Sequence, residues 1–375
     1  MTAEIEPFHA IAIAHLAYAL QSEGRTVIHM EIGQPSTGAP SKAIAAAHRV
    51  LDSDPMGYWE STALQKRLAQ HYAETYDVEA DPACFILTCG ASQALVLALM
   101  SSFAPGDRVA LARPGYVAYR NTLKALNLVP VEIPCGADVR YQLTAASLEA
   151  LDPPPAGVIV ASPANPTGTI IAADELRAIA KVCRARHIKI ISDEIYHGIS
   201  YVGPAHSMLE FEPSALVINS FSKYFSMPGW RLGWLLVPRD KLHHTRAYSG
   251  NLFLSTPSLS QHAALAAFDC KDELEGYVAV YARNRQRILE ALRRLKLGGI
   301  APPDGAFYIY ADIGHLTNDS LQFCKALLRE TGVATAPGID FDPVEGRRFI
   351  RMSFAVSTPE IETAIEKMES WISRL

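Results

Sequence analysis

Short apolar runs alternate with stretches of helical spacing through the middle of the chain. The runs that predict buried β-strands are FILT (85–88), RVALA (108–112), GVIVAS (157–162), IKIIS (188–192), ALVINS (215–220) and RLGWLLV (231–237). Segments with apolar residues at the spacing of an amphipathic helix follow the first three runs. Strands that alternate with helices favour βαβ units and a largely parallel, buried sheet. Thr144 and Ser41 are predicted to cap the helices that follow them.

The pattern changes after residue 270. A charged helical stretch (271–297) is followed by AFYIYADI (306–313), a predicted helix near 319–331, RRFIRMSFA (347–355) and a final helix from about 358. We therefore predict an α/β fold with two domains. The large domain, a doubly wound and mostly parallel sheet, would span 41–270, and a smaller α/β domain would combine 1–40 with 271–375.

Composition narrows the class of protein. The chain has 375 residues, of which 49% are hydrophobic and 19% charged, as is typical of a globular enzyme. The formal net charge is −5 and no basic cluster stands out, so neither nucleic acid nor an anionic membrane is expected as a partner. The six cysteines lack metal-site spacing, which favours reduced core thiols, no metal and a cytoplasmic location. The run FHAIAIAHLAYAL (8–20) predicts an amphipathic helix rather than a membrane span.

Ligands of open α/β sheets bind beyond the carboxyl ends of the strands, so the polar residues that follow each run are the candidate site. A glycine turn after 85–88 opens a helix at Ala91 and Ser92, whose backbone N–H groups could bind a phosphate, although a plain helix start is the commoner meaning of this pattern. Tyr116 could stack on a flat ring or pack at a helix start. Asn165 stands in a proline-rich loop that could be a simple turn.

One acidic and one basic side chain stand in unusual places in the sequence. Asp193 follows an apolar run directly and would need a cationic partner if buried, for which a structural salt bridge is the simpler explanation. Tyr196 would lie on the same side as Asp193 if a helix begins there. Lys223 stands among serines and aromatic residues, with Arg231 further along the same stretch, and the serines are Ser220 and Ser222.

Taken together, the predicted strand ends supply a lysine, an aspartate, a tyrosine, an asparagine, an aromatic ring and a helix start with a nearby arginine. This combination suits a flat, phosphorylated heteroaromatic aldehyde. It predicts pyridoxal 5'-phosphate bound to Lys223 as a Schiff base.

The chain resembles the fold-type I, class I/II pyridoxal-phosphate-dependent aminotransferases over essentially its whole length. The segments that carry the resemblance are EIGQPSTGAP, GASQAL, PGYVAY, NPTG, SDEIY, SFSKYFSMPGWRLGW and FIRMSFA. The separation of Asn165 from Asp193, and that of Lys223 from Arg231, also agree with the family.

The resemblance implies a role for each candidate around the cofactor ring. Lys223 would form the Schiff base and move the proton at the substrate's α-carbon. Asp193 would keep the pyridine nitrogen protonated. Tyr196 and Asn165 would donate hydrogen bonds to the phenolic oxygen of the ring, and Tyr116 would stack on its face.

The resemblance also implies which residues bind the phosphate and the substrate. The phosphate ligands would be the backbone N–H groups of Ala91 and Ser92, the hydroxyls of Ser220 and Ser222, and Arg231. Arg351 would bind the substrate's α-carboxylate, with Gly33 and Asn165 beside it.

A homodimer with shared active sites is implied as well. Tyr58 resembles a tyrosine that reaches the phosphate of the neighbouring subunit, but the segment from Tyr58 to Leu64 is shorter than the family pattern. Asn251 and Phe253 stand in a segment to which the family assigns interface and active-site residues.

The predicted activity is transfer of the amino group of an L-amino acid to a 2-oxo acid in a ping-pong cycle. Tyr18, Tyr58 and Tyr116 favour neutral or aromatic amino acids as substrates. A carbon–sulfur β-lyase, or a related enzyme on the same fold, remains the alternative, because its cofactor site would be nearly identical. A cofactor-binding regulator without catalysis is disfavoured by the presence of Lys223, Asp193 and Arg351.

Overall fold

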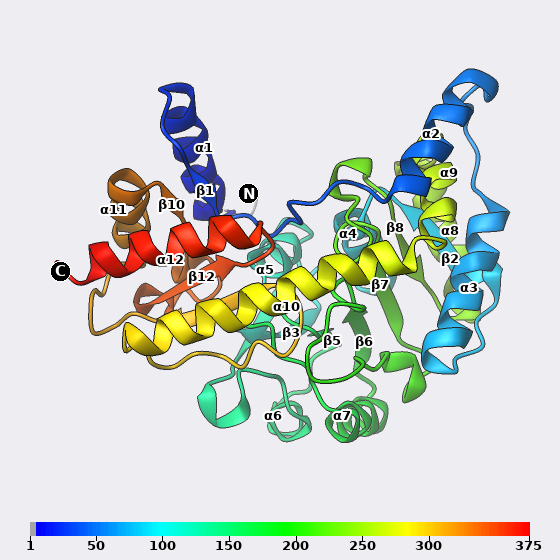
Figure 1. Ribbon diagram of the computed structural model, residues 1–375. Coiled ribbons are helices and arrows are strands. Elements are labelled where there is room, and N and C mark those ends of the chain that lie inside the picture. The colour runs from blue at the N-terminus through cyan, green and yellow to red at the C-terminus, as the bar shows by residue number, and fades with distance from the viewer. Residues whose placement is uncertain (1–4) are drawn as a thin grey trace.

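The computed structural model describes residues 5–375 and contains a large sheet and a small sheet, with one long helix, α10 (Lys271–Arg294), lying across both (Figure 1). The strands of the large sheet have the order β2-β8-β7-β6-β5-β3-β4. They are β2 (Phe85–Thr88), β3 (Arg108–Arg113), β4 (Val129–Pro134), β5 (Gly157–Ala161), β6 (Lys189–Asp193), β7 (Leu216–Ser220) and β8 (Gly233–Leu236).

The large sheet is mostly parallel, as the apolar runs predicted. Only β8 runs against its neighbours, β2 and β7. Strand β4 was not predicted, because Pro130, Glu132 and Pro134 interrupt its apolar pattern. This strand pairs with β3 alone, and prolines are tolerated on an edge strand because half of its backbone groups need no partner in the sheet.

Helices cover both faces of the large sheet, which makes the fold doubly wound. Alternate residues of β2 show the division, since Ile86 packs in one core cluster and Phe85 with Leu87 in another. The first face is covered by α4 (Ala91–Ser102), α5 (Val117–Ala125) and α8 (Leu242–Leu252). The second is covered by α2 (Ser41–Ser53), α3 (Thr62–Tyr76), α6 (Ala145–Glu149), α7 (Ala173–Ala185), α9 (Ser258–Ala267) and the start of α10.

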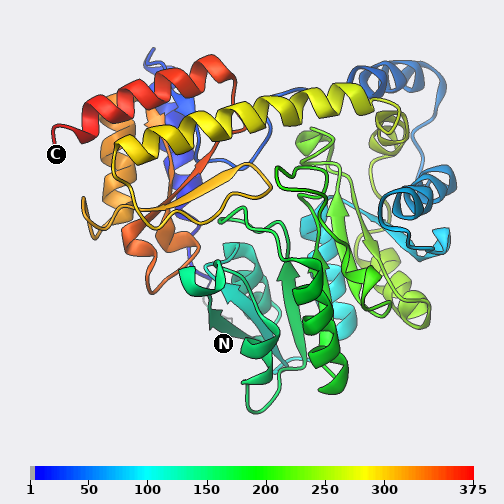
Figure 2. The ribbon, with the colours of Figure 1, turned by 60° about the horizontal axis from the view of Figure 1, so that its bottom comes forward.

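The small sheet is antiparallel, with the order β11-β12-β9. Its strands are β9 (Tyr308–Asp312), β11 (Ala336–Pro337) and β12 (Phe349–Ser353). The helices around it are α1 (His9–Ser22), α11 (Ser320–Thr331) and α12 (Thr358–Ile372), and α12 runs alongside α10 (Figure 2). A separate pair, β1 (Ile28–His29) with β10 (Val333–Ala334), ties the N-terminal segment to this region.

The two predicted helix caps have different outcomes. The Thr144 hydroxyl accepts a hydrogen bond from the Ser147 amide and closes a capping box, as expected. The prediction for Ser41 is wrong, because Pro40 occupies the N-cap position of α2. The amide and hydroxyl of Ser41 instead donate to Glu273 at the start of α10, a contact between distant parts of the chain that local pattern does not reveal.

Helix α10 packs on both halves of the molecule. Leu274 belongs to the core beneath the large sheet, whereas Tyr281, Ile288 and Leu292 belong to the core of the small sheet. The division of the chain at residues 41 and 271 stays a prediction, since α10 contributes to both cores. Within residues 5–375, no helix combines the length and apolarity that a membrane crossing requires.

Candidate active site

A cavity of about 550 Å³ opens where the carboxyl ends of β5, β6 and β7 face the small sheet and α1. It brings together most of the predicted site residues: Gly33, Ala91, Ser92, Tyr116, Asn165, Asp193, Tyr196, Ser222, Lys223, Arg231 and Arg351. The register of the parallel strands explains this convergence, because Asp193 is paired with Ala161 on one side and Ile218 on the other. The loops that follow these strands therefore start at the same edge of the sheet.

Lys223 lies in the turn after β7 and points into the cavity. Its Nζ donates to the carbonyl of Gly33 and lies 5.8 Å from the centre of the Tyr196 ring and 5.9 Å from that of Phe307. Burial lowers the pKa of Lys223 to about 8, and the nearby cations Arg351 and Arg231 act in the same direction. A lysine with this pKa provides a neutral amine at a pH where an ordinary lysine does not.

Asp193 ends β6 and is buried at the floor of the cavity. Its Oδ2 accepts a hydrogen bond of 2.6 Å from the hydroxyl of Tyr119, and its Oδ1 accepts one of 3.1 Å from the amide of Ile195. Burial raises the pKa of Asp193, while these two hydrogen bonds and the charge of Lys223 lower it. A buried carboxylate held in this way is suited to bind a cationic N–H group.

Tyr196 lies in a turn, so the condition that a helix begins at this position is not met. Its hydroxyl nevertheless reaches the cavity, where it lies 2.7 Å from the hydroxyl of Tyr308 on β9. A Cβ atom added at Gly33 would overlap that Tyr308 hydroxyl. Glycine at position 33 therefore allows the backbone to come close to this tyrosine pair.

A cradle for an anion lies at the start of α4. Gly90 is the N-cap residue, with a φ of 78°, and no side chain caps the free N–H groups of the first turn. Nη2 of Arg231 donates to the carbonyl of Cys89 at 3.2 Å. A Cβ atom on Gly90 would lie 2.6 Å from that Nη2, so glycine is what lets the guanidinium approach the turn. A helix N-terminus beside an arginine suits a phosphate.

Arg351 on β12 is 2% exposed and lies between the aromatic rings of Tyr308 and Phe341, at 4.6 and 4.8 Å from their centres. Its Nη1 donates to Oδ1 of Asn165 at 3.0 Å, and its Nη2 donates to the carbonyl of Glu31. Its Nε is buried without a hydrogen-bond partner. The guanidinium thus keeps donor capacity for a further acceptor such as a carboxylate.

Four predicted residues do not line the cavity. The Ser220 hydroxyl accepts a hydrogen bond of 3.1 Å from the amide of Ser222 and so supports the turn that carries Lys223. Tyr58 is 82% exposed, and Asn251 is exposed with its amide donating to Ala247. Phe253 packs beside the core around α4. Roles for these residues in a phosphate site or an interface stay predictions.

Tyr119 and Tyr308 were not predicted. Tyr119 stands three residues after Tyr116 on α5, so helical spacing could have indicated that both reach the same site. Tyr308 stands in a strand that reads as ordinary core, and no local signal marks it. In the part of the chain that the structure describes, no group of three or more His, Cys, Asp or Glu side chains could hold a metal ion.

The sequence profile described as aminotransferase class I and II matches residues 25–368. The chain therefore belongs to the class I and II aminotransferases, a family of pyridoxal-phosphate-dependent transferases, as the sequence resemblance predicted. Its architecture is the fold-type I architecture of its structural neighbours.

The relatives carry several substrate names. The valine–pyruvate aminotransferase of Mycobacterium tuberculosis is 44% identical over 379 residues, which cover 99% of this chain and 98% of the relative. The crystal structure of an aminotransferase from Mycobacterium tuberculosis matches with a TM-score of 0.96 and 44% identity, over 99% of this chain and 98% of that one. The aspartate aminotransferase of Thermus thermophilus, solved with maleate, matches with a TM-score of 0.91 and 27% identity, over 98% of this chain and 97% of that one.

Proposed function

We propose that the protein binds pyridoxal 5'-phosphate through Lys223 and transfers the amino group of a neutral L-amino acid to a 2-oxo acid. The observation that carries the proposal is that the amine of Lys223, the carboxylate of Asp193 and the guanidinium of Arg351 face one cavity. When bound, pyridoxal phosphate supplies a carbonyl that condenses with amines and a ring that withdraws electrons from the substrate's α-carbon.

The side chains around the cavity fit this cofactor. The start of α4 with Arg231 and Ser222 would hold the phosphate, and Asp193 would hold the protonated ring nitrogen. Tyr116 lies in the cavity wall, where its ring can cover a flat ligand. Asn165 and Tyr196 would donate hydrogen bonds to the oxygen on the ring.

Each reactive step would depend on a side chain of this protein. Arg351 binds the α-carboxylate of the substrate and orients its α-carbon toward Lys223, and the backbone at Gly33 lies beside that carboxylate. The amine of Lys223, which points into the cavity, would take the proton from the α-carbon of the bound substrate and hold it for return. Its lowered pKa suits this task because a protonated amine cannot act as a base.

The walls of the cavity support a neutral, apolar substrate side chain. Ile11 and Ala14 on α1, Ile32, and Leu95 and Val96 on α4 contribute to these walls. Among the described lining residues, the lysine and arginine side chains are Lys223, Arg231 and Arg351, and all three have roles above. The name of the valine–pyruvate relative agrees with this substrate class.

A homodimer is part of the proposal. Tyr58 is 82% exposed and lies outside the cavity of its own chain, which leaves it free to contact a second copy. Light scattering should then give twice the mass of the chain. A Tyr58→Phe variant should bind the cofactor more weakly if this hydroxyl reaches the phosphate of the partner.

The decisive experiment follows the absorbance of cofactor-loaded protein as single amino acids are added without an acceptor. Conversion to the spectrum of pyridoxamine phosphate, with release of a 2-oxo acid, would support transamination, and the rates would rank the donors. Continued release of ammonia and pyruvate would favour the β-lyase instead. A Lys223→Ala variant should lose the lysine-linked cofactor band, and retention of that band would refute the assignment of Lys223.

A further inference from the structure

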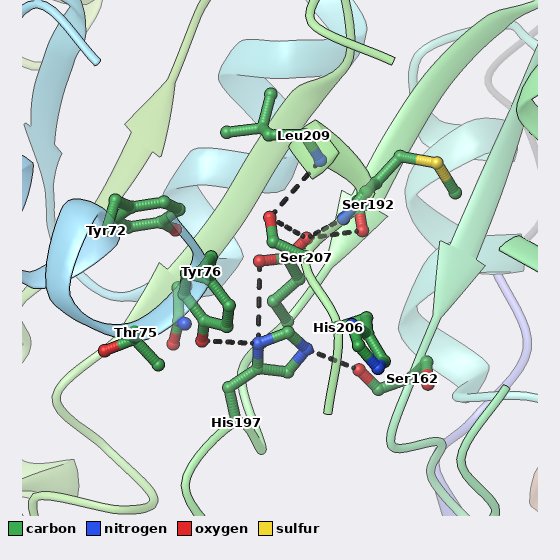
Figure 3. Close-up of polar contacts among 12 residues, drawn as sticks. Tyr72, Thr75, Tyr76, Ser162, Ser192, His197, His206, Ser207 and Leu209 are labelled. Carbon is green, nitrogen blue, oxygen red and sulfur yellow. Dashed lines mark hydrogen bonds and ion pairs between the residues drawn. The ribbon is translucent and has the colours of Figure 1, made fainter. Parts of the chain in front are cut away.

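Outside the cavity, on the turn that begins with Asp193, two further polar side chains are almost completely buried. Glu194 is 1% exposed and His197 is 6% exposed, and neither lines the cavity. Figure 3 shows His197 between Tyr76 and Ser162, at the centre of a group of polar side chains. The proposed reaction uses neither Glu194 nor His197, so their burial needs another explanation.

Only one of the two carboxyl oxygens of Glu194 accepts hydrogen bonds. Its Oε1 accepts from the hydroxyls of Ser192 and Ser207, each at 3.0 Å, and from the amide of Met208 at 2.9 Å. Its Oε2 accepts no hydrogen bond and lies 3.7 Å from Nδ1 of His197. Burial raises the pKa of Glu194 to about 8, so this side chain is a neutral acid at pH 7.

His197 connects two elements through its two ring nitrogens. Nε2 lies 2.9 Å from the carbonyl of Ser162, and Nδ1 lies 2.7 Å from the hydroxyl of Tyr76 on α3. Because a carbonyl can only accept, Nε2 must carry the proton, and Nδ1 accepts the hydrogen bond from Tyr76. Burial lowers the pKa of His197 to about 3, which keeps the ring neutral.

The network joins the ends of two neighbouring strands. Ser162 follows β5 and begins the loop that carries Asn165, whereas Glu194 and His197 belong to the turn that carries Asp193. The amide of Ser162 also donates to the carbonyl of Asp193 at 3.3 Å. His197 therefore fixes the backbone of one cavity-facing loop against the other.

We propose that Glu194 and His197 are positioning residues, which through their separate hydrogen bonds to neighbouring segments hold Asp193 and Asn165 in place at the cofactor site. The proposal rests on the proposed function, because it assigns the pair a role toward bound pyridoxal phosphate. Neither side chain touches the cofactor site itself.

The absence of charge on the pair matters for Asp193. An ionised Glu194 would place a second buried anion beside Asp193 and oppose its ionisation. The titratable groups around the pair are Asp193 on the same turn, Tyr72 and Tyr76 on α3, His71, and His206 and Glu210 near Met208. Among these, Asp193 is the group whose charge the cofactor needs.

The test compares variants by cofactor affinity and by the pH midpoint of the visible cofactor band, using purified apo-protein loaded with pyridoxal phosphate. His197→Phe leaves the Ser162 carbonyl and the Tyr76 hydroxyl unsatisfied, so we expect about 10-fold weaker binding and a shifted midpoint. His197→Gln, whose amide can donate to the Ser162 carbonyl, should recover most of both values. His206→Gln is the matched control and should behave like the wild type.

Further variants keep the proposal open to refutation if His197→Phe does not fold. Tyr76→Phe removes one hydroxyl and should weaken binding about threefold. Glu194→Gln imitates the neutral acid and should bind pyridoxal phosphate as the wild type does. A large loss of affinity in Glu194→Gln would contradict the claim that Glu194 is uncharged. If the affinity and the midpoint are unchanged in His197→Phe, whether or not the Tm falls, the pair has only a structural role and the proposal is refuted. A wild-type protein that binds no pyridoxal phosphate would instead refute the proposed function.

Discussion

Nη1 of Arg351 donates a hydrogen bond of 3.0 Å to Oδ1 of Asn165, and this bond joins the small sheet to the loop after β5 of the large sheet. The two residues stand far apart in the sequence. Arg351 was predicted to bind the substrate's α-carboxylate, and Asn165 was predicted to lie beside that carboxylate and to donate a hydrogen bond to the ring oxygen of the cofactor. Their contact couples the position of the small sheet directly to the cofactor site.

Arg351→Lys should lower kcat/KM by about 100-fold, because an ammonium cannot form the paired hydrogen bonds that a guanidinium forms with a carboxylate. The loss should appear with every amino acid substrate, since all share the α-carboxylate. Steady-state kinetics with several donors would measure it. Arg347→Lys, at an exposed position just before the same strand, is the control, and an equal loss in both variants would contradict the assignment.

The reactivity of Lys223 should depend on pH with a midpoint of about 8 in the apo-protein. Its pKa is lowered, so the amine is protonated below this value and becomes a neutral nucleophile as the pH rises through it. Competitive acetylation followed by peptide mass spectrometry would give the midpoint, with the exposed Lys66 as reference for the reagent. Arg351→Gln should raise the midpoint because it removes a neighbouring cation, and a fall would disagree with the electrostatics described above.

Tyr119→Phe should reduce kcat/KM by about 10-fold through loss of the hydrogen bond to Asp193. That hydrogen bond lowers the pKa of Asp193, so its removal should raise the pKa and move the acid limb of the pH–rate profile to higher pH. Tyr277→Phe removes a hydroxyl that binds Glu273, away from the cavity, and should leave the profile unchanged. If the acid limb does not move in Tyr119→Phe, the hydrogen bond from Tyr119 does not control the ionisation of Asp193.

Gly33→Ala should strongly reduce activity and lower the free energy of unfolding by about 1–3 kcal/mol, because the added Cβ overlaps the Tyr308 hydroxyl. Gly38→Ala adds the same atom at a position with nothing within 4 Å and serves as the control. Chemical denaturation and turnover assays would compare the two. Full activity in Gly33→Ala would show that the segment can retreat from Tyr308 without disturbing the site.

The sequence predicted the sheet well because its strands are buried on both faces and therefore read as continuous apolar runs. It also identified residues at or shortly after strand ends, such as Asp193 and Lys223, since parallel topology brings strand ends together. It failed where a residue acts through a distant partner. Tyr308 reaches the site from the small sheet, and Ser41 binds Glu273 instead of capping its own helix.

Helix α10 constrains how this chain can tolerate insertions and deletions. Its 24 residues form one uninterrupted rod, about 36 Å long, whose two ends are packed in different cores. One residue inserted between Leu274 and Tyr281 would turn the rest of the helix by about 100° and rotate its apolar stripe away from the small sheet. Arg351, carried by that sheet, would then lose its register with Asn165. Length variation among such chains is therefore expected in the loops, while the number of residues in this helix is held fixed by the geometry of a site that it never touches.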